Sequence, residues 1–137
     1  MKRFKIFVLV SFSTLTLAGC VPMISSGVRP LGAQEFLKGQ VVPGFPQLPL
    51  YEGAKVIESY GYKGSYGASF VTNSELAKVV KFYNDSLPQL GWETSVKELA
   101  PDNYVFEIKN EENIGSVIVN TASDNQKTAI TMSVSGR

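Results

Sequence analysis

The chain has 137 residues, a formal net charge of +1, no histidine and a single cysteine, Cys20. A disulfide within the chain, a metal site of cysteine and histidine, and catalysis by a serine–histidine or cysteine–histidine pair are therefore excluded. The basic residues are scattered, which gives no support for nucleic acid as a partner. We expect no cofactor and no metal, and the composition favours a protein that is not an enzyme.

Residues 1–19 have the organisation of a secretory signal peptide. Lys2, Arg3 and Lys5 form a basic start without an acidic residue, and residues 6–17 are uncharged and mostly apolar. This stretch is shorter than the roughly 20 residues that a helix needs to span a bilayer. Removal of residues 1–19 leaves 118 residues with ten basic and twelve acidic side chains, a net charge of −2. That length is enough for one domain and too short for two.

The apolar stretch ends at Leu17-Ala18-Gly19-Cys20, which resembles the lipobox of bacterial lipoproteins. The resemblance implies attachment of diacylglycerol to Cys20, cleavage between Gly19 and Cys20, and acylation of the new amino terminus by a palmitate-like chain. Two or more acyl chains anchor a protein stably, since each buried methylene contributes about 0.8 kcal/mol. In a cell with two membranes, Val21 resembles a signal for sorting to the outer membrane, facing the periplasm. The alternative is a buried thiol in an N-terminal apolar helix.

Residues 20–48 are interpreted as the lipidated cysteine followed by a tether, and residues 49–137 as the globular domain. Five of the seven prolines fall in residues 21–50, with glycines between them. Such a segment cannot sustain a helix or a central strand. Residues 41–50 are unusually apolar, so we expect their later part to lie against the domain in extended form.

The domain begins with a predicted hairpin and a helix. Residues 55–60 and 66–71 read as two strands joined by a glycine-rich turn. Thr72 and Glu75 have the spacing of a capping box. An apolar stripe at helical spacing follows: Leu76, Val79, Val80, Tyr83, Leu87 and Leu90. Pro88 should end or kink the helix near residues 86–88, and Val80 should be buried while Lys78 and Lys81 face water.

After Gly91, apolar residues recur at every second position, and this alternation predicts four more strands. They are expected over residues 92–99, 104–109, 115–121 and 130–135. The prediction is an α+β fold, ordered ββαββββ, with a single helix packed on one face of an antiparallel sheet. The other face should be solvated. The residues suited to it are Thr131, Ser133, Glu107 and Lys109.

Two motifs of the domain resemble those of small, uncharacterised bacterial lipoproteins. They are Pro49-Leu-Tyr-Glu-Gly-Ala54 and Phe82-Tyr83-x3-Leu87-x3-Gly91-Trp92, and the likeness covers residues 49–135. Members of that group often have proline after the tyrosine, where this chain has Glu52. The resemblance implies an α+β domain with one helix on a sheet, and it brings no catalytic residues.

Tyr60, Tyr62 and Tyr66 lie in the glycine-rich hairpin and are the candidate partner-binding residues. Aromatic rings on such a hairpin can stack on sugars or peptides, although packing on neighbouring strands is the simpler explanation. Phe82 is either a partner contact or a widening of the helix stripe. Tyr83 and Trp92 should pack at the helix end with their polar atoms on backbone carbonyls. The possible metal or catalytic groups are acidic: Glu111, Glu112 and Asp124 for calcium, and Glu93, Glu98 and Glu107 for acid–base chemistry.

Three functions are compatible with these patterns. The first is a membrane-anchored envelope lipoprotein that acts as a non-enzymatic binding module for an envelope protein or a cell-wall polymer. The second is a structural or assembly accessory that pairs with a partner through a sheet edge. The third and most remote is a carboxylate-dependent hydrolase. The membrane is a partner in all three through the lipid anchor.

Lipidation is directly testable. Mass spectrometry of the mature N-terminus should show an acylated Cys20 with residues 1–19 removed, because the box and its basic, apolar lead agree on that site. A chain in the membrane fraction that still begins at Met1 and carries no lipid would contradict the prediction.

Overall fold

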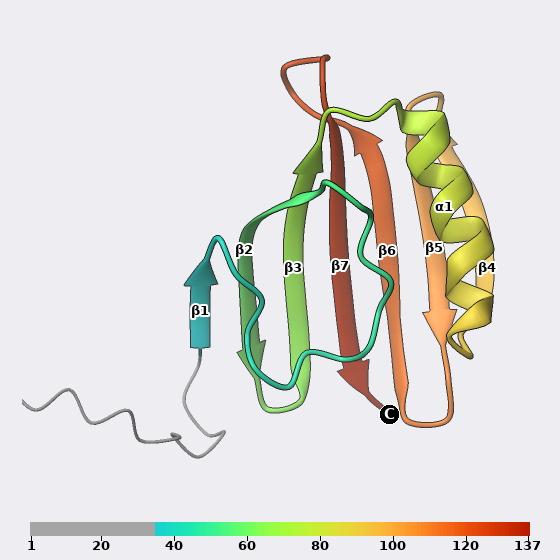
Figure 1. The fold of residues 1–137 in the computed structure, drawn as a ribbon. Coiled ribbons are helices and arrows are strands. Elements are labelled where there is room, and N and C mark those ends of the chain that lie inside the picture. Colours follow the sequence, from blue (N-terminus) through green and yellow to red (C-terminus); the bar gives the residue numbers. More distant parts are fainter. Residues whose placement is uncertain (1–34) are drawn as a thin grey trace, which may run out of the picture.

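The computed structural model describes residues 35–137, which form a seven-stranded antiparallel sheet with one helix against it (Figure 1). The predicted signal peptide, the predicted lipobox with Cys20 and the first part of the predicted tether lie outside the described residues. The elements are β1 (Glu35–Lys38), β2 (Lys55–Tyr62), β3 (Ser65–Thr72), α1 (Leu76–Gln89), β4 (Glu93–Ala100), β5 (Asn103–Lys109), β6 (Asn113–Thr121) and β7 (Thr128–Gly136). Their order across the sheet is β1-β2-β3-β7-β6-β5-β4.

The predicted α+β class with one helix and an antiparallel sheet is confirmed, but the predicted order ββαββββ lacks one strand. The added strand is β1, which pairs with β2 in the register Phe36↔Tyr60. Its four residues lie inside the segment interpreted as tether. The high proline content of the segment predicts a tether, but the prolines lie on either side of Glu35–Lys38 and none lies within it. A short run free of proline and glycine is enough for an edge strand.

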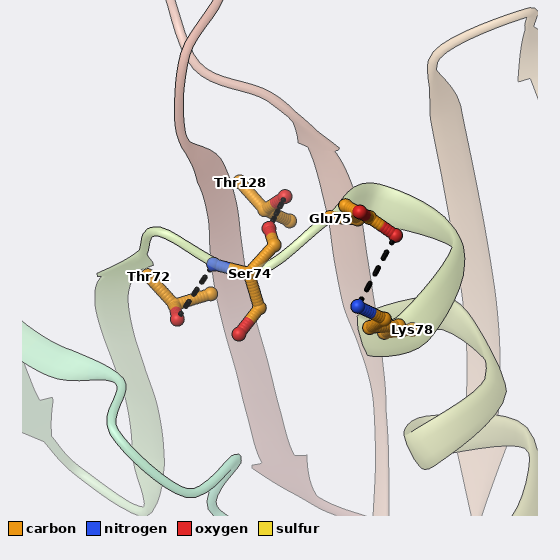
Figure 2. A network of polar contacts seen from close by, with 5 residues as sticks. All are labelled: Thr72, Ser74, Glu75, Lys78 and Thr128. Atoms are coloured by element: carbon orange, nitrogen blue, oxygen red, sulfur yellow. Dashed lines mark hydrogen bonds and ion pairs between the residues drawn. The ribbon is translucent and has the colours of Figure 1, made fainter.

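The helix begins later than the predicted capping box requires. Its N-cap is Glu75, which has extended backbone angles and makes no capping bond with its side chain. Thr72 is instead the last residue of β3, and its Oγ1 accepts a hydrogen bond of 3.2 Å from the Ser74 N–H (Figure 2). Glu75 pairs with the Lys78 ammonium at 3.3 Å. The Thr128 hydroxyl donates to the Ser74 carbonyl at 2.7 Å and so holds the β3–α1 connection against β7.

The end of α1 is set by glycine more than by proline. Pro88 lies within the last turn and the helix continues to Gln89, slightly beyond the predicted end. Gly91 then takes a φ of +83°, a conformation that glycine adopts without strain. The N–H groups of Trp92 and Gly91 donate to the carbonyls of Leu87 and Pro88 at 3.2 and 3.0 Å. This pair of bonds is a Schellman motif, which satisfies carbonyls that the helix end leaves free.

The core lies between the sheet and a cover of two parts. Helix α1 lies over the β6-β5-β4 side of the sheet, while residues 39–54 run across the β2-β3-β7 side on the same face (Figure 1). The helix residues Val79, Tyr83 and Leu87 are fully buried. The sheet contributes most of the other large buried side chains: Phe70, Phe106, Ile108, Val117, Val119, Ile130, Met132 and Val134. Tyr83 is buried as predicted, but Val80 is only half-buried, and Lys78 and Lys81 are exposed.

Residues 39–48 belong to the folded domain, although they were interpreted as tether. Val42 is only 2% exposed, and Phe45 and Leu48 pack against the core. The Trp92 indole N–H donates to the Gln47 carbonyl at 3.1 Å. The segment is extended, as expected of its later part, and the structure extends this packing back to Val42. Its prolines prevent regular structure but allow apolar side chains to cover a sheet.

Ser59 fixes the start of this covering segment. Its side chain is fully buried on β2, where Oγ accepts a hydrogen bond from the Val42 N–H at 2.9 Å. The same hydroxyl donates to the Gln40 carbonyl at 2.8 Å. One serine therefore satisfies two backbone groups of a segment that has no ladder of its own.

Ser59→Ala should destabilise the protein by about 1–3 kcal/mol, because it leaves the buried Val42 N–H without a partner. Each kcal/mol corresponds to a fall of about 4–8 °C in melting temperature for a domain of this size. The control is Ser133→Ala, which removes an exposed hydroxyl from the opposite face of the sheet. Equal melting temperatures for the two variants would show that the Ser59 contact does not hold the segment.

Val79→Asp should remove most of the stability, because it places an unpaired carboxylate in the interface between α1 and the sheet. Such burial costs several kcal/mol, against a total of about 5–15 kcal/mol for a typical domain. Asn84→Asp makes the same change of charge on the exposed side of the helix and should shift stability by no more than about 0.5 kcal/mol. Chemical denaturation measures both, and similar midpoints would contradict the packing of α1.

Candidate functional site

The strand register places the three candidate tyrosines on two different faces. Tyr60 lies opposite Gly67 and Tyr62 opposite Ser65, whereas Tyr66 lies opposite Gly61. Directly opposed residues of an antiparallel pair share a face, and successive residues alternate. Tyr66 therefore lies on the covered face with the core, and Tyr60 and Tyr62 lie on the face that no described element covers, here called the open face.

Tyr66 is a packing residue. Its ring meets Phe45 of the covering segment edge to face, with ring centres 5.9 Å apart. A Cβ at Gly61 would lie 3.2 Å from the Tyr66 ring, and one at Gly44 would lie 3.1 Å from its hydroxyl. The two glycines thus make room for the ring, and the packing interpretation of the hairpin holds for this tyrosine.

Tyr60 and Tyr62 form an exposed group with Phe36, here called the aromatic group. Their exposed fractions are 45%, 46% and 52% respectively, and Phe36 lies opposite Tyr60 in the β1–β2 register. A Cβ at Gly67 would come within 2.2 Å of the Tyr60 ring. Glycine at that position therefore lets the ring lie flat across β3. Sequence reasoning missed Phe36 because its segment was interpreted as tether, although a single large aromatic residue there was a usable signal.

Hydroxyl groups occupy the centre of the open face. Ser69 lies opposite Thr131, and Ser133 lies opposite Gly67, next to the aromatic group. Thr131 and Ser133 are exposed, as predicted, and so are Glu107 and Lys109 further across the sheet. A hydroxyl both donates and accepts hydrogen bonds. The open face therefore combines apolar rings with polar groups that are already exposed to water.

The far side of the open face carries two ion pairs. Lys97 meets Glu107 at 2.7 Å, and Lys109 meets Glu93 at 2.9 Å. Glu93, Glu107 and Lys109 line an open depression of about 440 Å³ on β4, β5 and β6. The bond from Lys109 holds the pKa of the Glu93 carboxyl below its usual range. A general acid needs the opposite shift, so this geometry favours an ion-paired surface over a catalytic pair.

The other acidic candidates do not form a site. Glu98 lies opposite Tyr104, on the face away from Glu93 and Glu107. A bond from the Gln126 N–H, with Lys127 nearby, lowers the pKa of Asp124. Among residues 35–137, no three acidic, histidine or cysteine side chains lie close enough together to hold a metal ion.

The aromatic residues of the helix have structural partners. Phe82 packs edge to face on Tyr51, with ring centres 5.2 Å apart, so it widens the helix stripe. The prediction for Trp92 is confirmed by its bond to Gln47. Tyr83 packs in the core as predicted, but its buried hydroxyl makes no hydrogen bond to a backbone carbonyl among residues 35–137, so that part of the prediction is wrong. Burial raises the pKa of Tyr83 accordingly.

Comparison of the chain with protein-family models, curated proteins and solved structures finds no significant match. The resemblance to small bacterial lipoproteins therefore stays a prediction. Between residues 35 and 137, no helix is long and apolar enough to cross a membrane.

Proposed function

We propose that the protein is a lipid-anchored envelope lipoprotein that acts as a non-enzymatic binding module for an envelope protein or a cell-wall polymer. The aromatic group of Phe36, Tyr60 and Tyr62 carries this proposal. Large rings gathered on an uncovered sheet face are typical of interaction surfaces. The lipobox at residues 17–20 supports the proposed localisation, which in a cell with two membranes is the outer membrane, facing the periplasm.

Binding at this surface has a simple physical basis. The rings offer apolar faces for a sugar or a peptide, and the hydroxyls of Ser133 and Thr131 beside them offer hydrogen bonds. Residues 21–34 connect the anchor to β1 and reach about 50 Å when fully extended. Anchoring keeps the module within about that distance of the membrane, so its effective concentration near membrane-bound partners is high.

A structural or assembly accessory that pairs through a sheet edge is the second candidate. It is favoured by the position of β4, which is eight residues long and lies at the edge of the described sheet. A hydrolase has less support, because Glu93 and Glu107 are both engaged by lysines.

Photo-cross-linking in native membranes tests the proposal. A benzoyl-phenylalanine at position 62 of the full chain should give a defined adduct, because that side chain points from the open face into solvent. The same residue at position 84, on the exposed side of α1, is the matched control. We expect adducts at position 62 at least about tenfold above those at position 84, and loss of those adducts in Tyr60→Ser. Equal yields at the two positions would overturn the aromatic group as the binding surface.

A further inference from the structure

The free edge of β4 has a charge pattern that is complementary to itself. β4 pairs with β5 on one side and ends the described sheet on the other. Every residue from Ser95 to Ala100 is exposed, as is Glu93. An uncovered edge strand presents backbone N–H and carbonyl groups that another strand can use.

Three residues of β4 point to the open face: Glu93, Ser95 and Lys97. They are two residues apart, and their β5 partners Lys109, Glu107 and Val105 lie on that face too. The order along the strand is thus negative, neutral and positive. Rotation by 180° about an axis perpendicular to the sheet, beside β4 and level with Ser95, sets the negative position of one copy opposite the positive position of the other.

We infer that β4 pairs antiparallel with β4 of a second copy of this chain, in a register centred on Ser95. Glu93 of each copy then lies directly opposite Lys97 of the other, and this happens twice because of the symmetry. Each of these charges already has an opposite partner on β5. The row across the junction therefore alternates in sign, from Lys109 to Glu93 and on to Lys97 of the second copy.

Competing registers are less favourable. A two-fold axis that keeps the open faces together must lie between the two β4 strands, level with one residue of each, and each axis is named here by that residue. An axis through Lys97 places this lysine opposite its own copy, which is destabilising. Axes through Thr94 and Val96 leave Glu93 opposite Ser95 and Leu99 respectively, without an opposite charge. Only the axis through Ser95 pairs both charges.

The same charges oppose pairing of this edge with unrelated strands. Charged side chains on an edge strand oppose indiscriminate pairing, and here they admit one partner sequence in one register. The irregularity between Glu98 and Ala100 interrupts the ladder with β5. It lies beyond residues 93–97, so the paired length ends before the strand bends.

Cysteine cross-linking of the full chain in detergent tests the register. Ser95→Cys should form a disulfide dimer under mild oxidation, because the two Ser95 positions oppose each other at a Cα distance of about 4.5–5.5 Å. Ser133→Cys, an exposed serine in the middle of the same face, should not. The unaltered chain, whose only cysteine is Cys20, measures any cross-link through that residue. A dimer yield at Ser95→Cys no higher than in these controls would overturn the inference.

Charge reversal tests the pairing itself. In the Ser95→Cys chain, Lys97→Glu sets two carboxylates opposite each other at both ends and should lower the dimer yield about tenfold. Adding Glu93→Lys restores opposite charges across the junction and should restore the yield. Thermal melting of each variant shows that the chain is still folded. Failure of the double variant to recover, in a folded chain, would contradict the register.

This inference is independent of the proposed binding at the aromatic group. Phe36, Tyr60 and Tyr62 lie at the β1–β2 side of the sheet, and β4 lies at the other end. In the Lys97→Glu chain, position 62 should still give its adduct above the position-84 control, so the failure of one proposal is distinguishable from the failure of the other.

Discussion

A single helix of 14 residues cannot cover one face of a seven-stranded sheet, and the rest of the structure depends on how that deficit is met. α1 buries Val79, Tyr83 and Leu87 over one side of the sheet. Without further cover, Ala68, Phe70 and Met132 on the other side would face water. Each buried apolar side chain contributes roughly 1.5–3 kcal/mol relative to exposure. Residues 39–54 therefore cover the part of the sheet that α1 leaves uncovered. They form an extended segment whose apolar side chains face the sheet.

Such a cover needs its own polar anchors, because an extended segment has no internal hydrogen bonds. Ser59 holds its start through Gln40 and Val42, and Trp92 holds its middle through Gln47. Trp92 also follows the Schellman end of α1, so the two parts of the cover are joined where the helix stops. Gly91 has a structural role for this reason: its positive φ directs the chain so that Trp92 enters the core.

The elements with a strong period were predictable from the sequence. The stripe of α1 and the alternation in β5, β6 and β7 depend on burial, which the sequence records directly. The covering segment has no period, so proline density suggested a tether and hid β1. Thr72 matched a capping pattern, but its place is fixed by pairing with Thr128 at the end of β3, a long-range contact that local spacing cannot reveal. The split of the tyrosines between faces followed from the register, which adds Phe36 to the site and removes Tyr66.

The two ends of the sheet have different chemistry, and the proposed binding and the proposed dimer would act together. One end carries exposed rings on β1 and β2, and the other carries ion pairs between the edge strand β4 and β5. A two-fold axis perpendicular to the sheet at Ser95 would leave both open faces on the same side, with an aromatic group at each far end of a continuous sheet. Two binding surfaces that face one way engage a repetitive partner such as a polymer together, and the second contact then forms at a high effective concentration. A dimer of this kind would bind a polymer far more strongly than it binds a single short ligand. The increase in affinity from short to long ligands would therefore be larger for the β4-paired dimer than for a monomer.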